Sequence, residues 1–218
     1  MTRKEYDKFD KANANFQALT PLSFIERSAK VFPDHPAIVY GEIKYSWKEL
    51  YARTIKLASA LTKLGIKHGD TVSILSANTP EMIEAHFGVP MSGAVLNTIN
   101  TRLDAETIGY ILNHSEAKVF IVDSELSPQA ESAIELSKNK DLYVIDIVDF
   151  QNAREPKTIG HITYDKFIGS GDADFDWQLP NDEWDAISLN YTSGTSGKPK
   201  GVVYHHRGSY LMSMGTIT

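Results

Sequence analysis

A short segment near the end of the sequence concentrates the residue types that bind phosphate. It reads Tyr191-Thr-Ser-Gly-Thr-Ser-Gly-Lys-Pro-Lys-Gly201 and holds three glycines, four Ser or Thr hydroxyls and two lysines. Glycine lets backbone N–H groups approach an anion without obstruction by a Cβ, hydroxyls donate hydrogen bonds, and lysines add positive charge. The segment therefore predicts a loop that binds a polyphosphate. The alternative is a flexible Gly/Ser turn between strands.

Two common motifs with a similar composition do not fit this segment. A Walker loop needs Ser or Thr directly after Gly-Lys, whereas Gly197-Lys198 is followed by Pro199. Proline would also disrupt the helix that begins there in a Walker loop. The hydrolase pattern G-x-S-x-G fails because Ser196 is followed at once by Gly197. The segment therefore indicates neither a Walker NTPase nor an α/β-hydrolase nucleophile.

The segment resembles the phosphate-loop signature of the adenylate-forming superfamily, which includes acyl-CoA synthetases, peptide-synthetase adenylation domains and firefly-type luciferases. Asn78 to Glu81 (NTPE) and Asn97 to Leu103 (NTINTRL) also resemble acyl-CoA synthetase segments, so the resemblance extends over most of the chain. Val202 to Tyr210 (VVYHHRGSY) is most similar to the short- and medium-chain acyl-CoA synthetases. That group includes the methylmercaptopropionate–CoA ligases and plant acyl-activating enzymes.

The resemblance implies a two-step reaction and a set of site residues. A carboxylate attacks the α-phosphorus of Mg-ATP, pyrophosphate leaves, and the CoA thiolate then displaces AMP from the acyl-adenylate. Positions in the signature assign phosphate contacts to eight residues: Thr192, Ser193, Gly194, Thr195, Ser196, Gly197, Lys198 and Lys200. Thr192 would also help to hold Mg²⁺, and Lys200 would stabilise the departing pyrophosphate. Lys198 ranks below Lys200 because relatives vary at its position.

His206 is a second candidate for a catalytic role. It aligns with a histidine near the acyl pocket of many relatives, where it would orient the substrate carboxylate with Tyr204 or His205 beside it. The alternative for a His-His pair after a strand is packing and backbone hydrogen bonding. The pair does not indicate a metal site, because adjacent ring nitrogens rarely reach one ion together and no third ligand is apparent.

The elements that must position these residues alternate between helix and strand from about residue 20. Helix starts are indicated at Thr20-Pro21, Ser46 with Glu49, Thr79-Pro80, Asp104 and Ser127-Pro128, and again from Arg207. Gly65 is placed to end the second helix. Strands are indicated at 37–40, 43–45, 71–75, 94–96, 118–122, 142–147, 186–191 and 201–205, the first two as a hairpin. This alternation predicts an α/β fold with a mainly parallel sheet layered with helices, the N-terminal part of the adenylate-forming enzyme fold.

Changes in composition divide the chain into four parts. We expect an N-terminal extension over 1–19, an α/β lobe over 20–149, an acidic loop-rich connection over 150–185, and over 186–218 the start of a second lobe with the phosphate-binding loop.

Composition excludes several classes of protein. The 218 residues include no cysteine, which rules out a disulfide scaffold, a thiolate metal site and a cysteine nucleophile. A net charge of −6 argues against a nucleic-acid or anionic-membrane binder. No apolar run approaches the ~20 residues of a membrane span, and the first residues lack the apolar core of a secretory signal. We therefore expect a cytoplasmic protein.

The resemblance also bears on the length of the chain. Relatives run to well over twice this length, so the sequence is expected to be an N-terminal fragment of an AMP-forming acyl-CoA synthetase, an acid–thiol ligase. The adenine, ribose and CoA sites and a C-terminal catalytic lysine would lie beyond Thr218, and the fragment alone would be inactive. The substrates would be ATP, CoA and a carboxylic acid of unspecified chain length; the oligomeric state stays open. The alternatives are a carrier-protein or luciferase-like adenylating enzyme, or a non-catalytic ATP- or anion-binding module.

Overall fold

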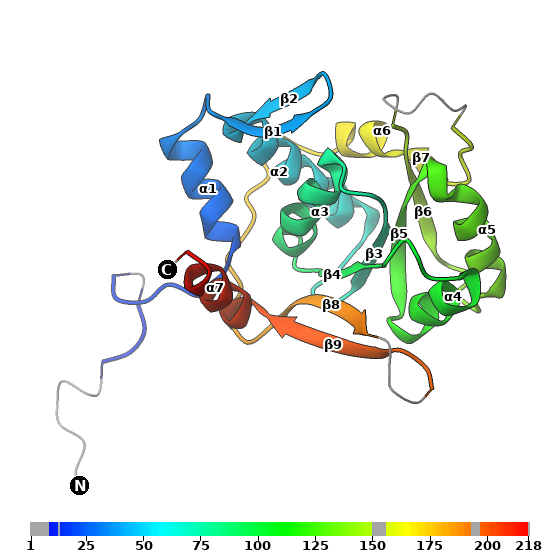
Figure 1. Ribbon diagram of the computed structural model, residues 1–218. Coiled ribbons are helices and arrows are strands. Elements are labelled where there is room, and N and C mark those ends of the chain that lie inside the picture. Colours follow the sequence, from blue (N-terminus) through cyan, green and yellow to red (C-terminus); the bar gives the residue numbers. More distant parts are fainter. Residues whose placement is uncertain (1–8, 13, 150–155, 193–196, 218) are drawn as a thin grey trace, which may run out of the picture.

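The computed structural model describes residues 9–12, 14–149, 156–192 and 197–217 (Figure 1). Its helices are α1 Leu22–Val31, α2 Trp47–Leu64, α3 Pro80–Met91, α4 Ala105–His114, α5 Ser127–Leu136, α6 Tyr164–Gly169 and α7 His206–Gly215, with a 3₁₀ turn, η2, at Ser124–Leu126. The strands are β1 Pro36–Tyr40, β2 Ile43–Ser46, β3 Thr71–Leu75, β4 Val95–Thr98, β5 Ala117–Asp123, β6 Tyr143–Ile147, β7 Ile162–Thr163, β8 Ala186–Thr192 and β9 Lys200–His205. Among the described residues, no helix is both long and apolar enough to cross a membrane.

The described strands form a hairpin of β1 and β2 and a seven-stranded sheet in the order β7-β6-β5-β3-β4-β8-β9. Every neighbouring pair in this sheet is parallel except β8 and β9, which are antiparallel. The predicted mainly parallel sheet is therefore confirmed. Because the carboxyl ends of β3, β4 and β8 meet at one edge, the segments after them are neighbours.

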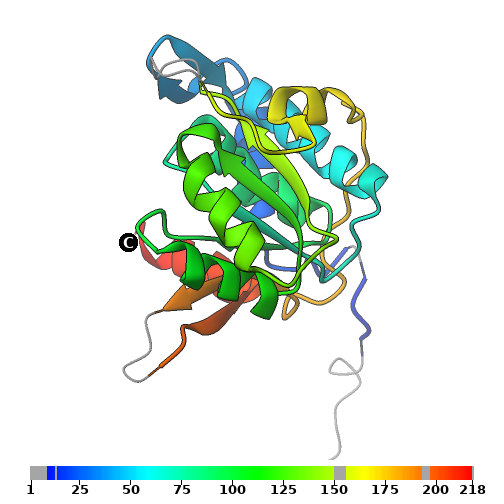
Figure 2. The same ribbon diagram turned by 90° about the vertical axis from the view of Figure 1, so that its right-hand side faces the viewer.

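Helices cover both faces of the sheet (Figure 2). On one face, α2, α3 and α6 bury a core that includes Leu57, Leu61, Val89 and Phe167 against β3, β5 and β6. On the other face, α4 and α5 bury Ile108, Ile111 and Ala133 against Phe120 and Val122 of β5. Side chains of β5 alternate between the two cores, as strand geometry requires. The layered α/β architecture follows from this two-sided burial.

Most of the helix signals in the sequence act as expected. The Ser46 hydroxyl accepts from the backbone N–H of Glu49, whose carboxylate accepts in turn from the N–H of Ser46. Gly65 ends α2 with a left-handed φ of 95°, and the Asp104 carboxylate accepts from the N–H of Thr107 at the start of α4. At the first helix the boundary differs: α1 begins at Leu22, and Thr20 bonds to its N–H from outside the helix at 3.3 Å.

Two short regular elements lie within the predicted acidic connection over 150–185. Within the described part, 156–185, the chain adds β7 to the edge of the sheet and then forms α6, which buries Tyr164, Phe167 and Ile168. These three apolar residues share one helical face, a signal masked by the polar residues around them. Strand β8 begins at residue 186, where a second lobe was predicted to start. It pairs with β4 and therefore belongs to the same sheet as the strands before it.

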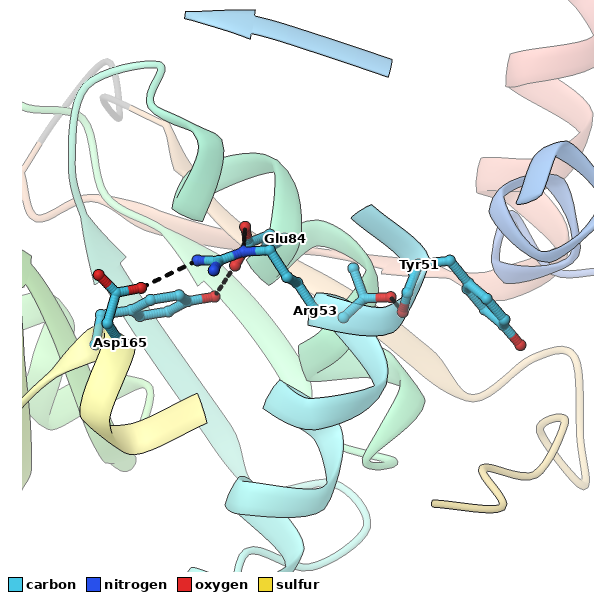
Figure 3. A network of polar contacts seen from close by, with 6 residues as sticks. Tyr51, Arg53, Glu84 and Asp165 are labelled. Atoms are coloured by element: carbon cyan, nitrogen blue, oxygen red, sulfur yellow. Dashed lines mark hydrogen bonds and ion pairs between the residues drawn. The ribbon is translucent and has the colours of Figure 1, made fainter. Parts of the chain in front are cut away.

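A polar network fastens α6 to α2 and α3 (Figure 3). The Glu84 carboxylate is fully buried and accepts from Arg53 Nε at 2.5 Å and from the Tyr164 hydroxyl at 2.9 Å. Arg53 also contacts Asp165 at 3.2 Å. A buried carboxylate is costly unless it is paired and hydrogen-bonded, and this one is both.

Candidate functional site

The predicted phosphate-binding segment connects β8 to β9 at the free end of their hairpin. Thr192 and Lys200 are partners in the ladder, so the two ends of the segment lie side by side, and both residues are exposed. Gly197 has a φ of +104°, a conformation that residues with a Cβ rarely adopt. Ser193, Gly194, Thr195 and Ser196 lie outside the described residues. The described geometry thus brings a hydroxyl and an ammonium group to one exposed end of the sheet.

Polar side chains of β4 form hydrogen bonds to β8 just before Thr192, the last residue of that strand. The Asn97 amide is fully buried and donates to the Leu189 carbonyl at 2.7 Å, while its oxygen accepts from the Ser73 hydroxyl at 3.0 Å. One residue on, the Thr98 hydroxyl donates to the Asn190 side chain at 2.8 Å. The NTINTRL segment therefore sets the position of the strand that ends in Thr192. A buried Asn inside an apolar strand was the available sequence signal for this role, because a buried amide needs partners.

Two residues of α4, which were not predicted as part of a site, contact Tyr191 and Lys198 of this segment. The hydroxyl of Tyr191 and Nδ1 of His114 are hydrogen-bonded at 2.7 Å. The Lys198 ammonium lies 5.1 Å from the centre of the Tyr110 ring. Only tertiary structure brings residues 110 and 114 beside 191 and 198, so no local pattern in the sequence could have shown these contacts.

His206 lies away from this end of the hairpin. It follows β9, whose other end carries Lys200, and its ring is buried with Nδ1 at 2.8 Å from the Thr20 hydroxyl. Burial lowers the pKa of His206 to about 4, so the ring is neutral near pH 7. The described structure therefore does not bring the two predicted catalytic residues, Lys200 and His206, together. The predicted role of His206 in orienting a carboxylate stays a prediction, and in the described structure its ring also lines a cavity with His68 and Trp177.

The described residues include no group of three or more His, Cys, Asp or Glu side chains that could hold a metal ion. Thr192, which is predicted to help to hold Mg²⁺, has an exposed hydroxyl, an oxygen ligand of the kind that Mg²⁺ takes.

Comparisons with solved structures support the fold. The crystal structure of the anthranilate CoA ligase AuaEII in complex with anthranoyl-AMP superposes with a TM-score of 0.78 at 25% identity, covering 90% of this chain and 37% of that one. The fold and the glycine- and hydroxyl-rich hairpin thus define the N-terminal region of an adenylate-forming enzyme.

Sequence comparisons give the family. The acetate–CoA ligase CCL3 of Humulus lupulus is 44% identical over 224 residues, which are 98% of this chain and 39% of that protein. The peroxisomal acetate/butyrate–CoA ligase AAE7 of Arabidopsis thaliana is 44% identical over 221 residues, with 97% and 39% covered. Residues 25–217 match the family described as AMP-binding enzyme, and the chain belongs to this family. The chain spans about two fifths of the length of these relatives.

Proposed function

We propose that residues 192–200 form the ATP phosphate-binding loop of an AMP-forming acyl-CoA ligase. The observation that carries this proposal is the position of Thr192 and Lys200, side by side at the exposed end of a hairpin in a member of the AMP-binding enzyme family. The names of the two relatives, both short-chain acyl–CoA ligases, support acid activation rather than another adenylating reaction. The whole protein would convert a carboxylic acid, ATP and CoA to an acyl-CoA, AMP and pyrophosphate.

The residues of the loop fit the charge changes of this reaction. A carboxylate oxygen attacks the α-phosphorus, the bond from that phosphorus to the bridging oxygen breaks, and pyrophosphate departs with the electron pair. Lys200, the hydroxyls of Thr192, Ser193, Thr195 and Ser196, and the backbone N–H groups of Gly194 and Gly197 would bind the oxygens on which negative charge grows. The CoA sulfur then attacks the carbonyl carbon of the acyl-adenylate and AMP leaves. Magnesium bound to the phosphates would neutralise part of their charge, with Thr192 as one ligand.

The proposal is tested by exchange of labelled pyrophosphate into ATP. The assay is run on this polypeptide and on a longer polypeptide that continues it to the length of the relatives, with acetate and butyrate as the first acids. We expect exchange from the longer polypeptide, and AMP release that depends on CoA. A requirement for a carrier protein in place of CoA would indicate a different adenylating enzyme. No exchange with any carboxylate would refute the enzymatic proposal.

Lys200→Ala tests the role of the loop directly. Loss of the ammonium removes a charge that stabilises the departing pyrophosphate, so we expect the adenylation rate of the longer polypeptide to fall roughly 10²-fold. Lys44→Ala, at an exposed position of β2, is the matched control and should leave the rate unchanged. An unaltered rate in Lys200→Ala would remove Lys200 from the catalytic residues.

The acyl chain and the compartment belong to this proposal as well. Short to medium carboxylates are the expected substrates, in line with the names of the relatives. The cytoplasm is our prediction for the compartment, whereas one relative is described as peroxisomal. Fluorescence microscopy of the tagged full-length protein distinguishes the two locations.

A further inference from the structure

A cavity of about 260 Å³ lies at the edge of the sheet opposite to the predicted phosphate-binding segment. Its lining includes residues that lie a few positions before three parallel strands: His68 before β3, Gly93 before β4 and Asn181 before β8. Thr192 is at the carboxyl end of β8, so the cavity is separate from that segment. All the residues that line the cavity belong to the described part of the chain. Because a cavity of roughly 150 Å³ can hold benzene, this one has room for a small organic molecule.

Apolar side chains from two elements form much of the wall. They are Pro90 and Met91 at the end of α3, and Phe175, Trp177 and Leu179 in the segment before β8. The indole N–H of Trp177 donates to the Tyr51 hydroxyl at 2.9 Å, so the polar atom of this ring already has a partner. A ligand would therefore gain affinity here mainly by burying an apolar body.

Of the polar side chains that line the cavity, only that of His206 is buried, with a relative exposure of 5%. Its Nδ1 lies 2.8 Å from the Thr20 hydroxyl. This hydroxyl is completely buried and accepts from the backbone N–H of Leu22 at 3.3 Å. Among the described residues, Nδ1 of His206 is the one acceptor available to its hydrogen. Nδ1 therefore accepts, and in the neutral ring the proton is on Nε2.

The Nε2–H group of His206 is available to a ligand in the cavity. Nε2 has no hydrogen-bond partner among the described residues, whereas every completely buried side-chain nitrogen or oxygen in that part of the chain has one. Nε2 therefore borders open space, and the ring lines this cavity. Burial lowers the pKa of His206 to about 4, against the opposing charge of Asp185, so the ring is a neutral donor at pH 7.

The charges around the cavity disfavour an anion. No lysine or arginine is present among the described residues that line it, whereas Asp176 is. The Asp185 carboxylate lies 3.7 Å from Nε2 of His68, another lining residue. An anion would lose hydration on entry without gaining a cationic partner from the wall. An uncharged carbonyl oxygen is therefore a better acceptor for Nε2–H than a carboxylate.

We propose that this cavity binds a small uncharged molecule with a carbonyl group on an apolar body, the carbonyl oxygen accepting from His206 Nε2 and the body packing against Met91 and Trp177. The site does not depend on the proposed function of residues 192–200. It also differs from the predicted role of His206 in orienting a carboxylate, because that role requires an anion. A ligand of about nine non-hydrogen atoms should bind with a Kd on the order of 1 mM.

Four molecules of similar size test the proposal. Benzamide has the carbonyl group and no charge, toluene lacks the acceptor, benzoate is an anion and benzylamine is a cation at pH 7. Binding to the 218-residue chain is measured by NMR from the shifts of the Met91 methyl group and the Trp177 indole. We expect benzamide to bind roughly three- to tenfold more tightly than each of the others, the scale of one hydrogen bond. Nitrogen-15 shifts of His206 should place its proton on Nε2.

Variants separate the hydrogen bond from the apolar wall. His206→Asn retains a polar partner for Thr20 but has a shorter side chain, so benzamide should lose its preference over toluene. Leu179→Ser removes part of the wall and should weaken both by a similar factor, about two- to fivefold. Leu136→Ser, at an exposed position of α5 outside the lining, is the matched control and should bind like the unaltered chain. The melting temperature of each variant shows whether it is folded in the assay.

Each other result overturns the proposal at a different point. Tighter binding of benzoate than of benzamide would overturn the uncharged ligand and favour the predicted carboxylate role of His206. Equal binding of benzamide and toluene, or a proton on Nδ1, would show that Nε2 is not the donor, and this comparison needs only the unaltered chain. No binding of any of the four would overturn the site itself. The proposed function is measured separately, by pyrophosphate exchange, and none of these results affects it.

Discussion

Glu84 is the clearest case in this chain of a residue whose state depends on its partners. Burial raises the pKa of Glu84 to about 7, although the charge of Arg53 and hydrogen bonds from Arg53 and Tyr164 act to lower it. Arg53→Met would leave the carboxylate buried with Tyr164 as its remaining hydrogen-bond donor in the network of Figure 3, at a cost of about 3 kcal/mol in the free energy of unfolding.

The loss of stability caused by Arg53→Met should depend on pH. Without Arg53, Glu84 can avoid the cost of a buried charge by taking up a proton, so the loss of stability should be smaller at pH 5 than at pH 8. Urea denaturation at the two pH values measures this difference. Lys30→Met, which breaks the exposed pair with Glu26, should cost less than about 0.5 kcal/mol. An equal loss at both pH values in Arg53→Met would show that Glu84 does not titrate in this range.

The contribution of His206 to the free energy of unfolding changes with pH in the opposite direction to that of Glu84. Burial lowers its pKa from an ordinary value of 6.5 to about 4, so between these values the unfolded chain binds a proton that the folded chain does not. The free energy of unfolding should therefore fall as the pH drops from about 6.5 to about 4. His206→Asn retains a polar partner for Thr20 and does not titrate. Urea denaturation at pH 7 and pH 4.5 should show a smaller loss of stability in this variant, and an identical loss would contradict the role of His206.

At the scale of elements, the contact between α2 and α3 depends on one glycine. A Cβ at Gly88 would lie 2.7 Å from Leu57 Cδ2 and 2.9 Å from the Thr54 carbonyl oxygen, so the two helices would have to separate. Gly88→Ala should lower the free energy of unfolding by about 1–3 kcal/mol, although alanine favours helix formation. Gly169→Ala, in α6 with no atom within 4 Å of the new Cβ, is the matched control and should be neutral or slightly stabilising. Equal stability of the two variants by urea denaturation would contradict this close packing.

The elements were predictable where their signals are local. Ser46 with Glu49, Gly65 and Asp104 act within a few residues of one helix end, and the strands at 71–75 and 186–192 are continuous or nearly continuous in residues that favour strands. The helix at 164–169 was missed because its three buried residues belong to a single turn and a half within a polar segment.

The site was predictable in its residue types but only partly in its geometry. Glycines and hydroxyls in one run identify the phosphate-binding segment, because each type has a known role in binding an anion. The positions of Tyr110, His114 and Asn97 depend on pairing between residues 77 to 92 positions apart, which the sequence of any one segment does not contain. The hydrogen bond between His206 and Thr20 is likewise a contact between distant segments, and no local pattern in the sequence contains it.

At the scale of the whole molecule, Glu183 links the segment before α1 to the start of α7. Its carboxylate accepts from the backbone N–H of Leu19 at 2.8 Å and pairs with Arg207 at 2.6 Å, while its carbonyl accepts from the N–H of Arg207. The rings of Phe24 in α1 and Tyr210 in α7 stack nearby, with centres 4.8 Å apart. Figure 1 shows α1 and α7 together at the end of the molecule opposite α4 and α5. We predict that the contacts of Glu183 slow the local opening of α1 and α7 without affecting the central strands of the sheet.

Glu183→Ala tests this coupling. Loss of both side-chain contacts should favour local opening, so amide hydrogens of α1 and α7 should exchange roughly tenfold faster, while those of β3, β5 and β6 keep their rates. Hydrogen–deuterium exchange with mass spectrometry resolves these segments. Glu131→Ala, which removes an exposed ion pair with Lys157 elsewhere on the molecule, should leave α1 and α7 unchanged. Faster exchange in α7 alone would show that Glu183 anchors only the second helix, and uniform acceleration across the sheet would show that the ends and the core unfold as one unit.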